Sequence, residues 1–294
     1  MKRILLLLCL IWFVKGINAQ TVSYNFSVDD PALVRNLSFA PFNYGFDFGK
    51  KALPLGNELF YTGHHVSLEA NFLTSGASKD TTKAMARINP YRELDLMAAI
   101  HIIDKTEAVS EKVTVSSTSD GTYKYEKFFY ADVQVRKIKA IRIGFETYNS
   151  YLQATVLQPG YTFNTTHEYV NYHTSMLCLG LLSKRVFNYV LDYGSTRTMK
   201  RMREIYLDFL IPISSKRDST VLPEYDGGGN KPVYHSLGGR LGWMHHSARI
   251  VGLYFKLEAG WLPGYQVTGA TTSYYTKLMI GFCFSSGAAK HVQL

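Results

Sequence analysis

Apolar and polar side chains alternate along residues 248–263 with the period of two that is typical of a β-strand. The apolar face carries large residues: Val251, Leu253, Phe255, Leu257 and Trp261. The other face is small or polar, with Lys256 and Glu258 near its middle. At ~3.3 Å per residue and a tilt of ~40°, the stretch from Val251 to Trp261 rises roughly 25 Å, the height of a barrel's apolar band. The pattern predicts a transmembrane strand with its apolar face toward lipid and its polar face toward a lumen.

Similar alternation recurs along the chain and predicts an all-β fold, an up-and-down antiparallel transmembrane β-barrel of about ten strands (range roughly 8–12). The other segments are 42–49, 65–73, 93–103, 123–135, 139–148, 169–182, 203–213, 234–244 and 273–285. The junction between 123–135 and 139–148 contains no Gly, Asn or Pro that would favour a tight turn. One long strand through both segments is therefore an alternative to a hairpin.

Loop lengths provide a second criterion, because bacterial barrels have periplasmic termini, short periplasmic turns and long outer loops. Counting back from the last strand places these connections outside: 50–64, 104–122, 149–168, 214–232 and 263–271. The short turns at 136–138 and 245–247 then lie inside, as the rule requires. Two inner connections, 74–92 and 183–202, are longer than expected and leave room for a short helix or another strand pair.

The N-terminus has the features of a secretory signal peptide. Lys2 and Arg3 precede an apolar run at 4–14, and a small-residue cleavage site ends at Ala19. This run is too short for a transmembrane helix, and no later segment approaches the ~18 apolar residues that such a helix needs. We predict a signal peptide at 1–19, a periplasmic segment at 20–40, a barrel at 41–285 and a C-terminal tail at 286–294. The expected location is the outer membrane.

Composition supports this interpretation without identifying a ligand. Aromatic residues make up 14% of the chain, with 21 Tyr, which favours strands and interfacial girdles. Trp243 and Trp261 are the predicted interfacial aromatics. The formal charge of +9 falls to +6 without the three signal-peptide cations, and an exported barrel is not expected to bind nucleic acid. The densest basic run comprises Lys184, Arg185, Arg197, Lys200, Arg201 and Arg203. Contact with anionic headgroups and an ordinary solvated turn are both compatible with it.

Charges on the predicted polar faces are the strongest chemical signal. We expect a lumen charge network of Asp47, Glu69, Asp95, Arg142, Glu146, Glu204, Asp208, Arg240, Lys256, Glu258 and Lys277. Other charges on polar faces are Glu93, Lys124, Glu126, Asp132 and Arg136. An eight-stranded barrel is just filled by side chains, whereas a water channel needs ~16 strands. The charges should therefore pair across a narrow lumen and leave no wide pore, with Arg142, Arg240 and Lys256 binding the surplus carboxylates.

Other candidate sites find less support. The adjacent pairs are His64–His65 and His245–His246. Neighbouring strand residues point to opposite faces, so neither pair can chelate one metal ion. His101 could join Ser67 and Asp47 in a Ser-His-Asp arrangement, but no nucleophile elbow accompanies it. We predict no enzymatic activity, no metal and no cofactor. Cys178 and Cys283 fit small apolar fillers better than a disulfide.

The combination of signal peptide, alternating segments and Tyr-rich composition resembles small outer-membrane β-barrel proteins of Gram-negative bacteria, in the aromatic-rich style of the Bacteroidetes. Phe282 and Phe284 are similar to the terminal aromatic signal of such barrels, although residues 285–294 follow. Asp80 and Asp218 begin motifs that look like Bacteroidetes O-glycosylation acceptors. The resemblance implies three kinds of partner: outer-membrane lipid with lipopolysaccharide, the barrel-assembly machinery, and an envelope protein of unknown identity.

These observations predict a structural, binding or narrow-transport role, carried by surface loops and a charged, largely filled lumen. An outer-membrane subunit of a secretion or conjugation machine is an alternative. A small porin, an outer-membrane enzyme and a soluble periplasmic β-sandwich also remain open.

Overall fold

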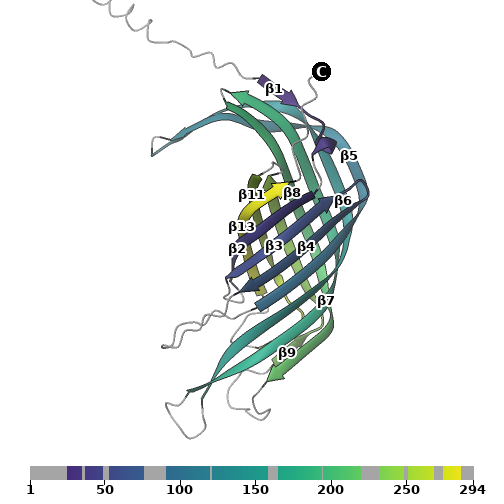
Figure 1. The fold of residues 1–294 in the computed structure, drawn as a ribbon, viewed down its shortest axis with the longest axis vertical. Helices are drawn as coiled ribbons and strands as arrows, with labels where there is room; N and C mark the ends of the chain where they lie inside the picture. The colour runs from purple at the N-terminus through teal and green to yellow at the C-terminus, as the bar shows by residue number, and fades with distance from the viewer. Residues whose placement is uncertain are drawn as a thin grey trace, which may run out of the picture.

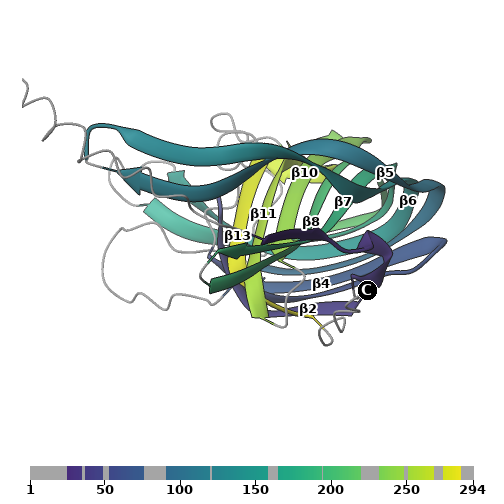
Figure 2. The same ribbon diagram turned by 90° about the horizontal axis from the view of Figure 1, so that it is seen from above.

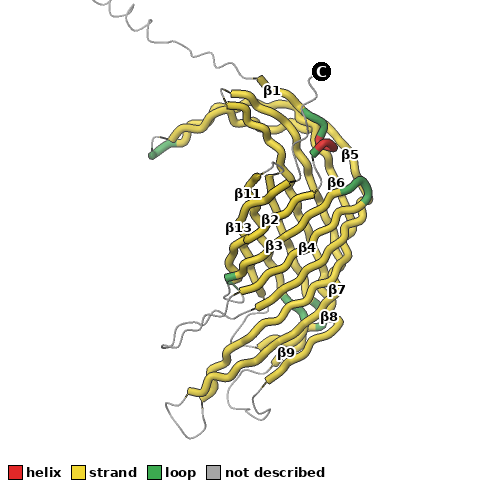
Figure 3. The backbone as a smooth tube through the Cα atoms, viewed as in Figure 1, coloured by secondary structure: helices red, strands yellow, loops and turns green. Residues whose placement is uncertain are grey.

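The computed structural model describes residues 25–34, 37–48, 53–75, 91–119, 121–157, 165–193, 195–219, 232–247, 251–267 and 274–285. The predicted signal peptide at 1–19, the tail at 286–294 and the Asp80 motif lie outside these residues. The described residues form thirteen strands and one short 3₁₀ helix, η1 (Pro31–Leu33) (Figure 3). None of their helices is long and apolar enough to cross a membrane.

Ten of the strands close into an antiparallel barrel (Figure 1). In order around the ring they are β2 (Leu37–Asp47), β3 (Pro54–Thr62), β4 (Val66–Ser75), β5 (Tyr91–Ser119), β6 (Lys124–Leu157), β7 (Thr165–Tyr193), β8 (Ser195–Ser219), β10 (Gly238–Ser247), β11 (Val251–Trp261) and β13 (Tyr274–Ser285). Pairing of β13 with β2 closes the ring, and the hydroxyls of Ser38 and Ser285 meet there at 2.9 Å. Every barrel strand pairs with the next barrel strand along the chain, which confirms the predicted up-and-down barrel.

Three short strands lie outside the ring. β1 (Asn25–Val28) pairs with the far end of β7, and β9 (Pro232–His235) pairs with β12 (Gly264–Val267) at the opposite end of the molecule. β2 begins at Leu37 and β13 ends at Ser285, so the two ends of the barrel chain lie at the same rim. We call this rim the terminal end.

The predicted number of strands is confirmed, although the prediction contains two errors. One strand was missed, and one long strand was counted as two, so the total is unchanged. Residues 54–62, predicted within an outer loop, form β3. Their inward face combines Gly56, Glu58 and Phe60, so it lacks a consistent polarity. The segments 123–135 and 139–148 belong to the single strand β6, as the alternative of one long strand proposed. Residues 136–138 therefore form no turn.

These two changes move two connections to the other end of the barrel. The β5–β6 connection, predicted outside at 104–122, lies on the same side as the chain ends. The β4–β5 connection, predicted inside at 74–92, lies at the opposite end. The predicted long connection at 183–202 is mostly strand, because β7 and β8 stay paired from Ser183 to Tyr193. Successive connections of an up-and-down barrel lie at alternate ends. A missed strand therefore places each following connection at the wrong end, until a second error, such as one strand counted as two, restores the order.

The barrel has apolar side chains outside and polar side chains inside. On β11 the outward residues are 40–63% exposed: Val251, Leu253, Leu257 and Trp261. The inward residues of the same strand, Tyr254, Lys256 and Glu258, are buried. Outward apolar residues on the other strands include Leu59, Leu68, Leu96, Ile143, Leu181, Leu207, Leu241 and Ile280. A soluble protein rarely exposes so large an apolar surface, whereas a membrane barrel requires it.

The β5–β6 and β7–β8 hairpins continue well beyond the terminal end and arch away from the barrel (Figures 1 and 2). Together with β1 they form what we call the terminal lobe: residues 25–34, 104–119, 121–135, 186–193 and 195–202. The lobe has its own apolar core of Val113, Val133, Val135, Phe187 and Tyr189. Phe26 of β1 packs edge-on against Phe129 with ring centroids 5.6 Å apart. The lobe is therefore a packed extension of the barrel wall.

The N-terminal segment crosses the terminal end of the barrel. The Asn188 side chain donates to the Asp30 carbonyl over 2.9 Å, and the Asp29 amide donates to the Asn188 carbonyl over 3.1 Å. Val34 is buried against Val186 and Met202, which continue the inward faces of β7 and β8. This contact anchors the segment at the mouth of the lumen.

Candidate functional site: the charged lumen

Arg240 lies at the centre of the charges inside the barrel. It projects inward from β10 and pairs in register with Asp208 of β8. Glycines make space around it. A Cβ on Gly242 would lie 2.0 Å from the Tyr206 ring, and a Cβ on Gly180 would lie 2.1 Å from Asp208 Oδ1. Small inward residues therefore allow large charged and aromatic side chains to meet near the barrel axis.

The Arg240 guanidinium contacts carboxylates from four strands. Its Nε donates to Asp208 Oδ2 over 2.8 Å, and its Nη1 donates to Asp95 Oδ2 at 3.0 Å and Glu146 Oε2 at 2.9 Å. Glu258 Oε2 lies 3.8 Å from Nη1. Because these carboxylates come from β8, β5, β6 and β11, one side chain joins walls on different sides of the lumen.

Two further cations extend the network along the lumen. Arg142 pairs with Glu69 over 3.1 Å, and its guanidinium lies 4.0 Å above the Tyr206 ring. Lys256 donates to Glu69 at 2.9 Å and to Glu58 at 3.2 Å. Glu69 therefore accepts from both cations, and the three side chains act as one unit.

Glu258 links the network to β13. Lys277 donates to Glu93 over 2.6 Å and lies 3.5 Å from Glu258. The hydroxyls of Tyr206 and Tyr275 donate to Glu258 over 2.5 and 2.8 Å. This carboxylate thus receives contacts from two tyrosines and a lysine on β8 and β13, which hold it in the lumen.

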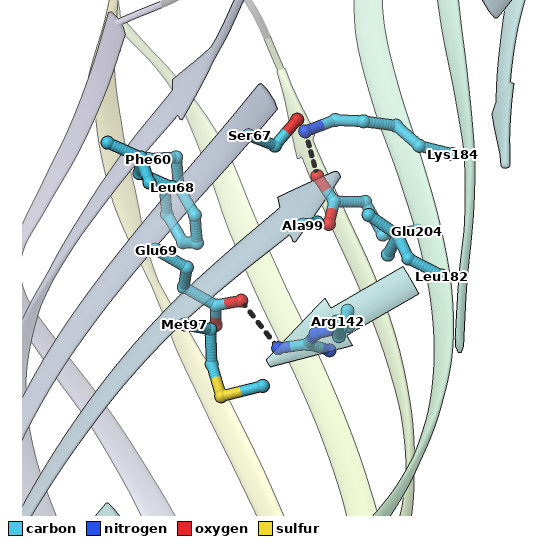
Figure 4. A pocket seen from close by; sticks show the side chains of 10 residues that line it. All are labelled: Phe60, Ser67, Leu68, Glu69, Met97, Ala99, Arg142, Leu182, Lys184 and Glu204. Carbon is cyan, nitrogen blue, oxygen red and sulfur yellow. Dashed lines mark hydrogen bonds and ion pairs between the residues drawn. The ribbon is translucent and has the colours of Figure 1, made fainter. Parts of the chain in front are cut away.

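A small cavity lies beside this network (Figure 4). The Arg142–Glu69 pair lines one part of it, and an ion pair between Lys184 and Glu204 lines another. Lys184 also donates to Thr62 Oγ1 over 2.7 Å. Arg240 does not line the cavity, but its Nη2 lies 3.4 Å from the sulfur of Met97, which does.

The structure places all eleven expected network residues on the inward faces of the barrel. Asp47 is opposite Lys277 in the register of β2 and β13, and the other nine take part in the contacts above. Glu93 and Arg136 are also buried. The expectation is wrong for Lys124, Glu126 and Asp132, which lie in the terminal lobe instead. They belong to β6 beyond the point where it leaves the ring.

Sequence reasoning missed two members of the lumen. Glu58 lies on the unpredicted strand β3, and Lys184 was assigned to a turn although β7 continues through it. The available signal was the alternation of outward Leu55, Leu59 and Tyr61 with inward residues on β3. Among described residues the buried lumen carboxylates number nine: Asp47, Glu58, Glu69, Glu93, Asp95, Glu146, Glu204, Asp208 and Glu258. They outnumber the six buried cations named above, which are Arg136, Arg142, Lys184, Arg240, Lys256 and Lys277. The lumen therefore favours cations.

The structure brings Ser67 and His101 together but not Asp47. Ser67 Oγ lies 2.8 Å from His101 Nε2. His101 Nδ1 is 3.1 Å from the His64 carbonyl and 3.5 Å from Asp104, whose two oxygens bond Arg136. The carbonyl contact fits an Nδ1–H tautomer, with Nε2 free to accept the Ser67 proton. A serine nucleophile also needs oxyanion donors, and none is apparent in the contacts of the described residues.

Cys178 and Cys283 are buried free thiols, so they are not joined in a disulfide. The ligand atoms of Asp95, Glu146 and Cys178 lie close enough to hold a metal ion. Arg240, however, already pairs with both of these carboxylates. The site is therefore better described as a guanidinium site.

The predicted interfacial tryptophans both point outward. Trp243 and Trp261 are about 40% exposed, and Trp243 lies edge-on to Phe255 at 5.2 Å. The Trp261 indole donates to the Leu237 carbonyl over 3.2 Å. Trp261 lies at the end of the apolar surface away from the terminal end, whereas Trp243 is opposite Leu257, near the middle of β11.

No protein-family model and no curated protein matches this chain. Among solved structures it is similar to the NanC porin, with a TM-score of 0.29 and 9% identity over 85% of this chain and 100% of that one. It is also similar to the CymD monoaromatic hydrocarbon channel, with a TM-score of 0.23 and 10% identity over 88% of this chain and 92% of that one. Likeness at this level gives no information about what this chain binds.

Proposed function

We propose that the protein is a non-enzymatic outer-membrane β-barrel whose lumen is closed by its own ion pairs, and that it serves a structural or binding role through the parts that project from the membrane. The observation that carries this proposal is the position of Arg240. It bonds carboxylates on strands from different sides of the ring, so it occupies the path that a solute would take.

The energetics support a closed state. Arg240 and three of its partners, Asp95, Glu146 and Asp208, are nearly inaccessible to solvent. Removing one member of such a buried pair typically costs ~3–5 kcal/mol, because the remaining charge is left without a partner. Opening a path would break several of these contacts together. The N-terminal segment, held by Val34 at the terminal mouth, adds a second obstruction.

The apolar exterior supports a membrane location, and the sequence features at 1–19 support export. In this arrangement the chain ends and the terminal lobe would face the periplasm, as they do in bacterial barrels. The opposite end, with β9 and β12, would face outward.

Planar-bilayer recording tests this function directly. We expect the unmodified protein to show no large steady conductance after insertion, verified by protection of the barrel from added protease. Arg240→Ala should introduce a small conductance that prefers cations, because surplus carboxylates remain. The matched control is Lys112→Ala, which removes an exposed lobe cation paired with Glu126. A large steady conductance in the unmodified protein would instead identify a porin.

One observation favours a second candidate, a subunit of an envelope secretion or conjugation machine. The β5–β6 hairpin of the lobe exposes four aromatic residues: Tyr123, Tyr125, Phe128 and Tyr130. Aromatic clusters of this kind are common in protein interfaces. Crosslinking in intact cells, followed by purification of the barrel, tests it. A partner lost on Tyr125→Ser and Tyr130→Ser, but retained with Lys112→Ala, would support this candidate.

A further inference from the structure

Basic residues form a row across five neighbouring strands near the terminal end, beginning with Lys105 of β5, which is opposite Lys137. Lys137 of β6 pairs in register with Arg185 of β7, Arg185 pairs with Arg203 of β8, and Arg203 pairs with His245 of β10. Directly paired residues place their side chains on the same face with Cβ atoms about 4.5–5.5 Å apart. Like charges in such positions destabilise a sheet unless something neutralises them.

The row follows the lipid-facing surface of the barrel. Arg185 lies four residues after Leu181 on β7, and Arg203 lies two residues before Ile205 on β8. Each arginine therefore projects from the same strand face as that apolar residue. Both apolar residues point outward and are more than half exposed. On the far side of the row, Val135 and Phe187 are buried in the core of the terminal lobe. The cations therefore lie between the apolar membrane surface and the lobe, at the level expected for headgroups.

Protein carboxylates neutralise only part of this positive charge. Glu107 pairs with Lys137 and with Lys105, and Glu111 pairs with Arg201. Lys139 lies two residues after Lys137 on the same face of β6, opposite Ser183. Over the described ranges, no carboxylate lies within 4 Å of Lys139, Arg185 or Arg203. The Arg203 guanidinium is 5.4 Å from the centre of the Phe187 ring, a contact that orients its planar group.

The charge is confined to one side of the barrel. At the same end, the outward positions of β2, β3, β4, β11 and β13 are apolar or aromatic: Leu37, Tyr61, Val66, Val251 and Phe284. On β5, Lys105 lies opposite Lys137 and pairs with Glu107. If these cations only attracted the protein to an anionic membrane surface, similar cations would be expected on every strand. Among the described residues of this region, the lysines and arginines without a carboxylate within 4 Å lie on β6, β7 and β8, which indicates a local site.

We propose that Lys139, Arg185 and Arg203 bind the phosphate of an anionic glycerophospholipid in the leaflet on the side of the terminal lobe. The acyl chains would lie along the apolar surface below, on residues such as Leu181 and Ile205. The two guanidiniums match phosphate oxygens in bidentate geometry, and the lysine adds a point charge. This inference rests on the proposed membrane location.

Lipid retention tests the site. The full chain is inserted into nanodiscs of equal parts phosphatidylglycerol and phosphatidylcholine, extracted in mild detergent, and analysed for bound lipid by native mass spectrometry. We expect retention of phosphatidylglycerol over phosphatidylcholine. The double variant Arg185→Gln and Arg203→Gln should weaken retention by about fivefold for each cation removed. The matched control, Lys112→Gln with Lys124→Gln, removes two lobe cations that pair with Glu126 and should retain lipid normally.

Three results would overturn the proposal. The first is equal retention of the two lipids by the unmodified protein, and the second is an equal loss in the control variant. The third is displacement of phosphatidylglycerol by millimolar inorganic phosphate, which would show that free phosphate is the ligand. A chain that never enters nanodiscs would refute the membrane location itself, whereas a chain that enters without lipid preference refutes only this site.

Discussion

Arg240 and Asp95 meet over 3.0 Å although they are 145 residues apart and lie on strands that are not neighbours in the ring. Three strands, β6, β7 and β8, separate β5 from β10 along the shorter way around the barrel. The contact therefore crosses the lumen. It shows how narrow the interior is, and it makes this pair the natural place to test what the network does.

Replacing Arg240 should destabilise the barrel strongly. We expect Arg240→Ala to lower the free energy of unfolding by ~3–5 kcal/mol, because several buried carboxylates lose their shared cation. Urea unfolding in detergent or lipid, followed by tryptophan fluorescence, measures the change. Lys112→Ala, at an exposed lobe pair, should change stability by less than about 1 kcal/mol. Equal effects of the two substitutions would show that the lumen network contributes no special stability.

A double-mutant cycle can separate the pair from its surroundings. We expect the double variant, Arg240→Ala with Asp95→Asn, to lose less free energy of unfolding than the two single variants added together. Each single substitution leaves the remaining partner without its ion pair, whereas the double substitution removes both partners. The coupling should exceed about 1 kcal/mol in the same urea experiment. Strict additivity would mean that Asp95 does not depend on Arg240.

The lipid-facing surface predicts a depth dependence on β11. Phe255 lies near the middle of the outward face and Val251 at its terminal end. Phe255→Lys should cost ~2–4 kcal/mol, whereas Val251→Lys should cost ~0–1 kcal/mol near the interface. Folding yield into vesicles measures both. Greater damage from Val251→Lys would place the membrane midplane elsewhere.

A closed barrel in detergent should migrate differently on gels before and after boiling. The ring is complete, with β13 paired to β2, so heat is needed to separate its strands. We expect faster migration of the unboiled protein and retention in the membrane fraction after carbonate treatment. Identical migration together with release by carbonate would favour a soluble β-sandwich.

Ser67 should not act as a nucleophile despite its 2.8 Å contact with His101. The contacts of the described residues around it include no oxyanion donor, and the Asp104 carboxylate is engaged by Arg136. A fluorophosphonate probe should leave the folded protein unlabelled, with a serine hydrolase as positive control for the reagent. Labelling that disappears in both Ser67→Ala and His101→Ala would establish an active serine and contradict the non-enzymatic assignment.

The alternation along residues 248–263 was sufficient to predict β11, because lipid and lumen act separately on the two faces of each strand. The same argument predicted the inward direction of Arg240, Asp95 and Lys256 from local sequence alone. It failed for β3, whose inward Gly56 and Phe60 are not polar, since small and aromatic residues can face either medium. It also could not show that β6 passes through residues 136–138, where the strand leaves the barrel and joins the lobe.

Only the tertiary structure determined which charges meet. Alternation assigns a side chain to a face, whereas a partner across the lumen depends on strand register, tilt and ring closure, which involve the whole barrel. Glu69 could therefore be predicted to face inward, but its sharing between Arg142 and Lys256 could not. The same holds outside the barrel. Arg185 and Arg203 are 18 positions apart in the sequence, and the pairing of β7 with β8 alone places them side by side.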